Sequence, residues 1–328
     1  MKATILGLGY YLPDKVLTNQ DLEKMVDTSD TWIVERSGIR ERHILAPDEP
    51  CSLMAVEAAR RALQDANLDA AELDMIIVGT VSGDMLFPAT ACLLQAELGA
   101  VNAAAFDLGA GCTGFIYALA VAEKFLLASA MSHILVVGAE AVSKVLDYTD
   151  RSTCVLFGDG AGAVVMGKAD GDYGIITSYL GADGRGAKDL YMPAGGSAIP
   201  ATAESVAQRL HYLRMNGTEI FKFATKAMPE ISDKLVNQAG LSYRDIDLFI
   251  PHQANLRIIQ LAAKRMQIPM EKVLINLDRC GNTSAGSIPV ALAEAYEQGR
   301  LKKGDIILMV AFGAGLTFGG AILRWGRD

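Results

Sequence analysis

The chain has few of the residues that build metal clusters, disulfide frameworks or basic binding surfaces. Its 328 residues include only four histidines and five cysteines, and the cysteines are widely scattered with no Cys-x-x-Cys pair. Such spacing is typical of reduced thiols in the cytosol and excludes a recognisable zinc or disulfide framework. Lys and Arg number 30 against 38 Asp and Glu. The net charge of −8 argues against general affinity for nucleic acid or an anionic membrane.

The chain also lacks the patterns of a signal peptide, a membrane span and a dinucleotide-binding loop. The apolar start MKATILGLGYYLP soon reaches glycine and proline and has no small-residue cleavage site, so we expect a cytoplasmic protein. The apolar stretch after Cys112 is interrupted by Glu123 and Lys124, which favours a buried helix over a transmembrane one. Neither GLGYYL nor GDGAGA completes the pattern G-x-G-x-x-G.

Short, continuously apolar segments alternate with helical patterns along the chain. These segments begin at Met75, Ile134, Gly162, Leu248, Ile306 and Gly319. Strands that are apolar along their whole length are typical of sheets covered on both faces. With a hydrophobic content of 51%, the sequence therefore predicts a layered α/β fold with a sizeable core.

The second half of the chain echoes the first at a spacing of 173 residues. Residues 62–79 resemble residues 235–252, which aligns Asp74 with Asp247. The same spacing aligns two further elements through the pairs Ala118 and Ala291, and Val137 and Val310. A repeat this long exceeds the periods of solenoids and propellers. It indicates two duplicated α/β halves, which we expect to span residues 1–173 and 174–328.

Cys112 lies in the stretch DLGAGCTGF, between a strand-like and a helical segment. At a helix N-terminus the unpaired N–H groups and the helix dipole favour a thiolate, so the position suits a nucleophile. The neighbouring glycines permit a tight turn and close approach of a substrate. A buried cysteine can equally be a small core residue, and this stretch alone leaves both interpretations open.

His252 and Asn282 are candidate partners for this thiol. His252 follows the apolar strand LFIP directly, and functional groups in α/β sheets gather at such strand ends. Asn282 lies in the turn RCGNTSAGS, which the repeat aligns with the loop that carries Cys112. The glycine-rich stretch AFGAGLTFGG offers backbone N–H groups suited to an oxyanion hole. Taken singly, each motif has a structural explanation as well; their combination indicates a nucleophilic cysteine with partner residues and an oxyanion hole.

The motifs DLGAGCTGF, PHQANLR, GNTSAGSIP and FGAGLTFGG together resemble the thiolase superfamily, and within it the β-ketoacyl-acyl carrier protein synthase III family. The resemblance covers essentially the whole chain. It implies a five-layered αβαβα fold made of two similar halves, usually as a homodimer. It further implies an acyltransferase that initiates fatty acid synthesis, with acyl-CoA and malonyl-acyl carrier protein as substrates and no metal or redox cofactor.

The resemblance also assigns roles to residues. Cys112 would accept the acyl group, His252 and Asn282 would support condensation, and the N–H groups of Cys112 and Ala314 would form the oxyanion hole. Thr28, Trp32 and Arg36 of the segment DTSDTWIVERSGIR would bind CoA, together with Arg151 of the segment DYTDRSTCVLFGDGAG. The carrier protein would contact Lys222, Gln253, Ala254, Asn255, Leu256, Arg257, Lys264 and Arg265. Phe87, from the partner subunit, Val142 and Phe157 would shape the acyl pocket.

Other functions are compatible with the same residues. A related acyltransferase or condensing enzyme of secondary metabolism would join the acyl group to a different acceptor. A cysteine thioesterase would use Cys112 and His252 to release a free acid. A non-catalytic module that binds acyl carrier protein would form no covalent intermediate.

Overall fold

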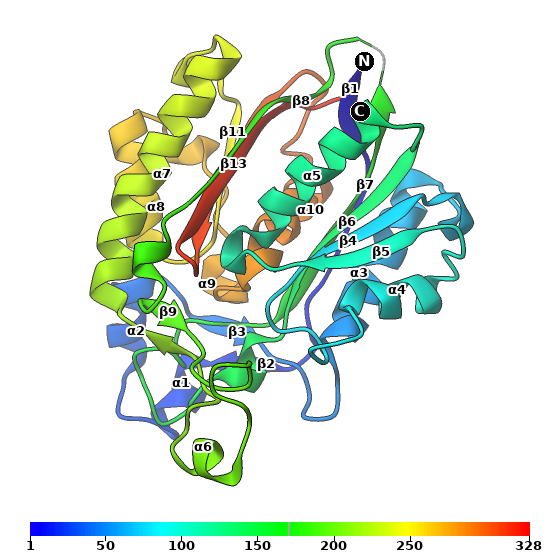
Figure 1. The fold of residues 1–328 in the computed structure, drawn as a ribbon. Helices are drawn as coiled ribbons and strands as arrows, with labels where there is room; N and C mark the ends of the chain where they lie inside the picture. The colour runs from blue at the N-terminus through cyan, green and yellow to red at the C-terminus, as the bar shows by residue number, and fades with distance from the viewer. Residues whose placement is uncertain (170) are drawn as a thin grey trace.

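Two β-sheets form the framework of the molecule (Figure 1). The computed structural model describes residues 1–169 and 171–328. The first sheet has the order β1-β7-β6-β4-β5, built from β1 (Lys2–Tyr11), β7 (Gly160–Ala169), β6 (His133–Glu140), β4 (Met75–Gly79) and β5 (Ala104–Leu108). The second has the order β11-β12-β13-β8, built from β11 (Leu248–Pro251), β12 (Ile306–Gly313), β13 (Thr317–Arg324) and β8 (Gly174–Ala182).

Helices fill the space between the sheets and cover their outer faces (Figure 1). Between the sheets lie α5 (Gly114–Ala128) and α10 (Ser287–Glu297). On the outside of the first sheet are α3 (Cys51–Ala66) and α4 (Thr90–Leu98), and on the outside of the second are α7 (Gly217–Ala239) and α8 (Leu256–Met266). The result is the predicted five-layered αβαβα arrangement of two similar halves.

Short helices and strands connect these layers near the end of the sheets where Cys112 lies. The helices are α1 (Asn19–Glu23), α2 (Asp30–Ser37), α6 (Ala203–Ala207) and α9 (Leu277–Cys280). The strands pair as β2 (Val16–Thr18) with β3 (Glu41–His43), and β9 (Leu190–Tyr191) with β10 (Arg214–Met215).

The duplication seen in the sequence is repeated in the elements and in their hydrogen bonds. Strand β6 begins at His133 and β12 at Ile306, 173 residues later, and the same shift separates the starts of α5 and α10. Asp74 accepts a hydrogen bond from the N–H of His133, and Asp247 accepts one from the N–H of Ile306. Equivalent carboxylates bind the first N–H groups of equivalent strands, so the two halves share this hydrogen bond as well as their topology.

Packing explains why the long apolar helix α5 belongs to the core. Residues 111–128 are long and apolar enough to cross a membrane, but 67% of them are buried in the folded chain. Phe115 and Leu119 pack with Ile288 of α10 in the core between the sheets. The interruption by charge at Glu123 and Lys124 falls in the same helix, so its pattern is that of a buried helix, as predicted.

Candidate active site

Cys112 sits at the junction of strand β5 and helix α5. The single-turn helix η2 (Gly111–Thr113) leads directly into α5, so the thiol lies at a helix head, as predicted. Gly313 of β12 approaches closely, because a Cβ atom there would lie only 2.6 Å from the backbone nitrogen of Cys112. This contact brings the two halves of the chain together at the sulfur and leaves Cys112 only 8% exposed.

Burial, rather than the helix end, dominates the acidity of this thiol. Burial raises the pKa of Cys112 to about 12, the Ser284 hydroxyl lowers it, and the Glu140 carboxylate raises it. The N–H groups of Cys112 and Ala314 face the sulfur and also lower its pKa. The expectation of a resting thiolate was therefore wrong. In this buried environment the sulfur holds its proton until reaction, and the proton must then have a destination.

His252 is a buried, neutral imidazole. It follows β11 directly and its backbone N–H donates to the carbonyl of Val310 at 2.8 Å. Burial lowers the pKa of the ring to about 3. Nδ1 lies 2.7 Å from Ser287 Oγ, which also accepts the N–H of Gln253 at 3.5 Å. The Ser287 hydroxyl can donate to Nδ1, and in that arrangement the imidazole proton lies on Nε2.

Asn282 is held in the loop before the single-turn helix η7 (Ser284–Gly286). Its Oδ1 accepts the backbone N–H of Ser284 at 2.9 Å, and its own backbone N–H donates to Leu156 at 2.9 Å. Because Oδ1 is engaged inside the loop, Nδ2 remains as a donor. Asn282 therefore offers a second uncharged N–H donor beside that of His252.

Two cavities meet at Cys112. The first, of about 90 Å³, is lined by Cys112, His252 and Asn282, with Phe157 and Phe312 among its apolar walls. The second, of about 180 Å³, is lined by Cys112, Ser284, Ala314, Val142 and Phe157. The sulfur thus borders both a space with two neutral donors and a more apolar space next to the N–H of Ala314.

The residues expected to bind CoA gather around one aromatic ring. The guanidinium carbon of Arg151 lies 5.3 Å from the centre of the Trp32 ring, and that of Arg36 lies 6.0 Å from it. Arg151 also donates to the Asp27 carbonyl at 2.8 Å. The hydroxyl of Thr28 is buried without a hydrogen-bond partner. A flat ring beside two cations that stand 115 residues apart in the chain can stack on a base while the cations face phosphate.

The residues expected to contact the carrier protein divide into an exposed and a buried set. Arg257, Lys264 and Arg265 are exposed on α8, and Lys222 is exposed on α7, where it pairs with Glu219 at 2.7 Å. Ala254, Asn255 and Leu256 are half-buried at the start of α8, and Asn255 donates to the Arg36 carbonyl at 2.9 Å. The carrier surface defined by these cations therefore adjoins the Trp32 cluster.

Gln253 corrects the sequence-based assignment. It is 1% exposed, and its side-chain amide donates to the carbonyls of Pro251 and Leu274 at 2.8 and 3.1 Å. Its Oε1 accepts the N–H of Asn276. Gln253 joins the end of β11 to residues 274–276 in the interior and cannot touch a docking partner, because its side chain is buried like that of the preceding residue His252.

The residues expected at the acyl pocket are also separated within the chain. Val142 and Phe157 both line the 180 Å³ cavity next to Cys112. Phe87 lies instead on the surface and is 82% exposed, with Leu86 beside it at 84%. Within one chain Phe87 does not reach the cavity, so any contribution from it must go to a second copy.

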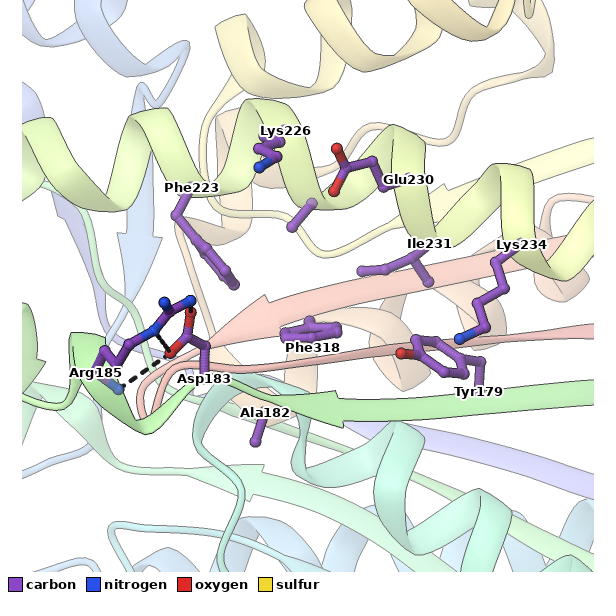
Figure 2. A pocket seen from close by; sticks show the side chains of 11 residues that line it. Tyr179, Ala182, Asp183, Arg185, Phe223, Lys226, Glu230, Ile231, Lys234 and Phe318 are labelled. Atoms are coloured by element: carbon purple, nitrogen blue, oxygen red, sulfur yellow. Dashed lines mark hydrogen bonds and ion pairs between the residues drawn. The ribbon is translucent and has the colours of Figure 1, made fainter.

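A larger cavity lies elsewhere and takes no part in this arrangement. It measures about 490 Å³ and lies beneath α7, over β8 and β13 (Figure 2). Arg185 is bound there to Asp183, and the Lys234 ammonium lies 3.6 Å from the centre of the Tyr179 ring. Two of its cations are thus engaged with neighbours, and none of the three residues predicted for acyl chemistry lines it. Among the described residues, no cluster of His, Cys, Asp and Glu could hold a metal ion.

Three residues in contact with the site or with each other were not predicted from the sequence: Glu140, Ser284 and Ser287. Ser287 touches His252, while Ser284 lies 3.3 Å from the sulfur of Cys112 and 3.1 Å from Glu140. The two serines stand in the motif GNTSAGS, whose repeated hydroxyl residues are a usable signal. Glu140 has a weaker signal: a lone carboxylate that ends a continuously apolar strand.

Comparison with known proteins agrees with this fold. Residues 106–184 match the family model for 3-oxoacyl-[acyl-carrier-protein (ACP)] synthase III, and residues 236–325 match the model for its C-terminal part. The beta-ketoacyl-[acyl-carrier-protein] synthase III of Syntrophomonas wolfei is 63% identical over all of this chain and 99% of that protein. The crystal structure of the Aquifex aeolicus synthase III superposes with a TM-score of 0.91 at 47% identity, covering 98% of this chain and 100% of that one.

A solved structure from another pathway is similar too. The priming β-ketosynthase of the R1128 polyketide pathway is 36% identical, with a TM-score of 0.91 over 99% of this chain and 97% of that one. The fold and these matches define an acyl-transferring condensing enzyme with a thiolase-like fold. The chain belongs to the β-ketoacyl-[acyl-carrier-protein] synthase III family, whose members initiate fatty acid synthesis.

Proposed function

We propose that this protein transfers an acyl group from acyl-CoA to Cys112 and condenses it with malonyl-acyl carrier protein. The products are carbon dioxide, free CoA and β-ketoacyl-acyl carrier protein. The observation that carries the proposal is the meeting of one thiol, Cys112, with two neutral N–H donors, His252 and Asn282, at a single cavity. This chemistry requires no metal or redox cofactor.

In the first step the sulfur of Cys112 attacks the thioester carbonyl of acyl-CoA. The new C–S bond forms, the bond to the CoA sulfur breaks, and CoA leaves as a thiolate that then takes a proton from water. The N–H groups of Cys112 and Ala314 stabilise the oxyanion, a role supported by their orientation toward the sulfur. A preorganised donor of this kind is worth about 10²–10³ in rate. The acyl chain extends into the 180 Å³ cavity beside Val142 and Phe157.

In the second step the malonyl thioester occupies the cavity of His252 and Asn282. Nε2–H of His252 and Nδ2–H of Asn282 donate to its carbonyl oxygen, loss of carbon dioxide leaves an enolate, and the enolate carbon attacks the acyl-enzyme. Neutral donors suit this step because they hold their N–H protons tightly, so they stabilise the negative charge of the enolate without protonating it. The low pKa of His252 supports this role, since the ring stays neutral across the physiological range.

Acyl-CoA and malonyl-acyl carrier protein reach Cys112 through the same entrance. The Trp32 cluster with Arg36 and Arg151 holds the CoA nucleotide, and Thr28 offers an unused hydroxyl beside it. The cations of the carrier surface receive an acidic carrier protein despite the net charge of −8. Asn255 links α8 to Arg36, which supports successive use of a shared entrance by the two partners.

The active form is a homodimer in the cytoplasm. Within each chain the two duplicated halves span residues 1–173 and 174–328. Strand β5 ends the first sheet with half-buried residues, whereas its neighbour β4 is fully buried. Exposed Met85, Leu86 and Phe87 add apolar surface near one edge of the molecule. An open edge strand and an apolar patch are the features that pairing with a second copy would cover. In the pair, Phe87 would extend toward the partner's acyl pocket.

Single-turnover reactions test the proposed roles. With labelled acyl-CoA and no malonyl substrate, we expect the wild type to become labelled and the Cys112→Ala variant to remain unlabelled. The variants His252→Ala and Asn282→Ala should acquire label but fail to release it as β-ketoacyl product when malonyl carrier is added. Cys92→Ala is the matched control, because that thiol is exposed on α4, and it should react normally. Label retained on Cys112→Ala would refute the assignment.

A priming role in secondary metabolism is the second candidate, favoured by the similarity to the polyketide priming synthase. The 63% identity to the Syntrophomonas wolfei synthase favours fatty acid synthesis instead. Values of kcat/KM for acetyl, branched and longer acyl-CoAs, each with malonyl carrier, separate the two. A thioesterase would release free acid in the same assay, and a binding module would form no acyl-enzyme.

A further inference from the structure

A buried carboxylate is connected to the nucleophile through one hydroxyl. Glu140, the last residue of β6, is 0% exposed. Ser284 Oγ lies 3.1 Å from Glu140 Oε1 and 3.3 Å from Cys112 Sγ. Since a hydroxyl both donates and accepts, Ser284 can accept the thiol proton on one side while it donates to the carboxylate on the other.

The hydrogen bonds around Glu140 keep its carboxylate in place without neutralising it. The N–H of Val81 donates at 3.2 Å, the Thr80 hydroxyl at 3.4 Å, and the Ser82 hydroxyl also donates. All of these donors are neutral. Burial without a positive partner disfavours the charged form of a carboxylate and so favours protonation. Burial accordingly raises the pKa of Glu140 to about 7, despite these bonds.

Two thiols are the titratable groups that face this carboxyl: Cys112 from η2 and Cys51 from α3. Burial raises the pKa of both, and the charge of Glu140 raises each further. The pKa of Cys51 is also raised by Asp84 and Asp159. Cys112 alone of the two is joined to Glu140 through Ser284. A thiolate and a carboxylate so close disfavour each other, so Cys112 and Glu140 hold one proton between them.

Ser284 adopts a backbone conformation that favours glycine, which indicates that its side chain has a role at this position. Ser284 has φ of +51°, a conformation that favours glycine, and the equivalent residue in the first half is Gly111, with φ of +54°. Left-handed backbone is energetically unfavourable at a residue other than glycine. One half thus uses the unstrained residue at this corner, and the other carries a serine whose Oγ reaches the reacting sulfur.

We propose that Ser284 and Glu140 form a proton relay for Cys112. During acylation the thiol proton passes to Ser284 Oγ and the hydroxyl proton of Ser284 passes to the Glu140 carboxylate, while the sulfur bonds to the acyl carbon. CoA leaves as a thiolate and takes a proton from water. During condensation the Cys112 sulfur leaves the acyl carbon as a thiolate, and the same relay returns the proton from Glu140.

This relay supplies a destination for the proton that burial holds on Cys112. Ser284 touches the reacting sulfur and is a catalytic residue, whereas Glu140 acts through it. A positioned proton acceptor contributes about 10²–10⁴ in rate. The inference rests on the proposed acylation of Cys112: if the wild type forms no acyl-enzyme, the proposed function fails, and the relay is tested only against a wild type that reacts.

The test is the rate of acyl-enzyme formation with acetyl-CoA alone, followed by quenching and intact mass, from about two pH units below to two above neutrality. The wild-type rate should rise with pH as Glu140 loses its proton, with an inflection near 7. Glu140→Gln keeps the size and removes the proton acceptor. It should react about 10²-fold more slowly at the upper end and show no inflection there. Ser284→Ala should behave alike, and Glu140→Asp should recover part of the rate together with an inflection.

Asp159→Asn is the matched control. Asp159 is equally buried at 0% exposure and accepts hydrogen bonds from Ser143 and the Leu45 N–H, outside the relay. It should keep the wild-type pH profile, and circular dichroism should show every variant folded. A Glu140→Gln variant that retains the inflection near 7, whether fast or slow, would overturn the relay. So would a Ser284→Ala variant that matches the wild-type rate.

Discussion

Lowering the pH should destabilise the wild type more than a His252→Gln variant. Burial lowers the pKa of His252 from 6.5 to about 3, so the folded protein holds this ring neutral while the unfolded chain protonates it below pH 6.5. A depressed pKa contributes stability that is fully present above the unfolded value and is lost as the pH falls toward the folded one. Between pH 7 and pH 5 the loss from this residue is about 2 kcal/mol.

Urea unfolding at those two pH values, for both proteins, measures this difference. Other groups that titrate in the range, Glu140 among them, are common to both proteins and cancel in the comparison. The variant loses the bond to Ser287 and starts from a lower stability, so the change with pH is the quantity to compare. Equal losses in the two proteins would show that folding does not lower the pKa of His252, so that the ring becomes protonated in the folded state at pH 5. They would contradict an imidazole held neutral by burial.

Three further outcomes are expected. Gly313→Ala should reduce acylation by more than about tenfold, because its Cβ would lie 2.6 Å from the Cys112 nitrogen and displace the nucleophile; a wild-type rate by rapid quench would contradict this. Trp32→Ala should raise the KM for acyl-CoA about tenfold with little change for malonyl carrier, as steady-state kinetics with each substrate varied can show. Arg257→Glu should raise the KM for malonyl carrier and weaken its salt dependence; an unchanged salt dependence would count against docking at α8.

The fold could be predicted from the sequence because its signals are local and repeated. The six apolar segments chosen as strands form β4, β6, β7, β11, β12 and β13. The spacing of 173 residues identified the duplication, and the paired carboxylates Asp74 and Asp247 show its physical basis. These signals can be recognised in the sequence because each strand is apolar on both faces and because Asp74 and Asp247 each bind the start of a strand in their own half.

The site was predictable only in part. Cys112 and His252 stand at ends of strands, where the local pattern marks them, and the family motif supplied Asn282. Gln253 was misassigned because the family motif was carried over as a whole, and only the folded chain shows that its amide is buried and joins the end of β11 to residues 274–276. The role of Glu140 depends on a contact with a residue 144 positions away, which no local pattern encodes.

Acidity shows the same limit. The helix head at Cys112 is visible in the sequence and predicts a thiolate, but the degree of burial is not visible, and burial decides the protonation state. The effect of desolvation depends on every element packed around the sulfur, including Gly313 from the other half of the chain.

The most direct test of the central claim is intact-mass analysis of one sample in two stages. After acyl-CoA is added, the account predicts a single acyl adduct that peptide mapping assigns to Cys112. After malonyl-acyl carrier protein is added, the adduct should disappear as β-ketoacyl-acyl carrier protein forms in equal amount. An adduct on another residue, or loss of the adduct as free acid, would contradict the account.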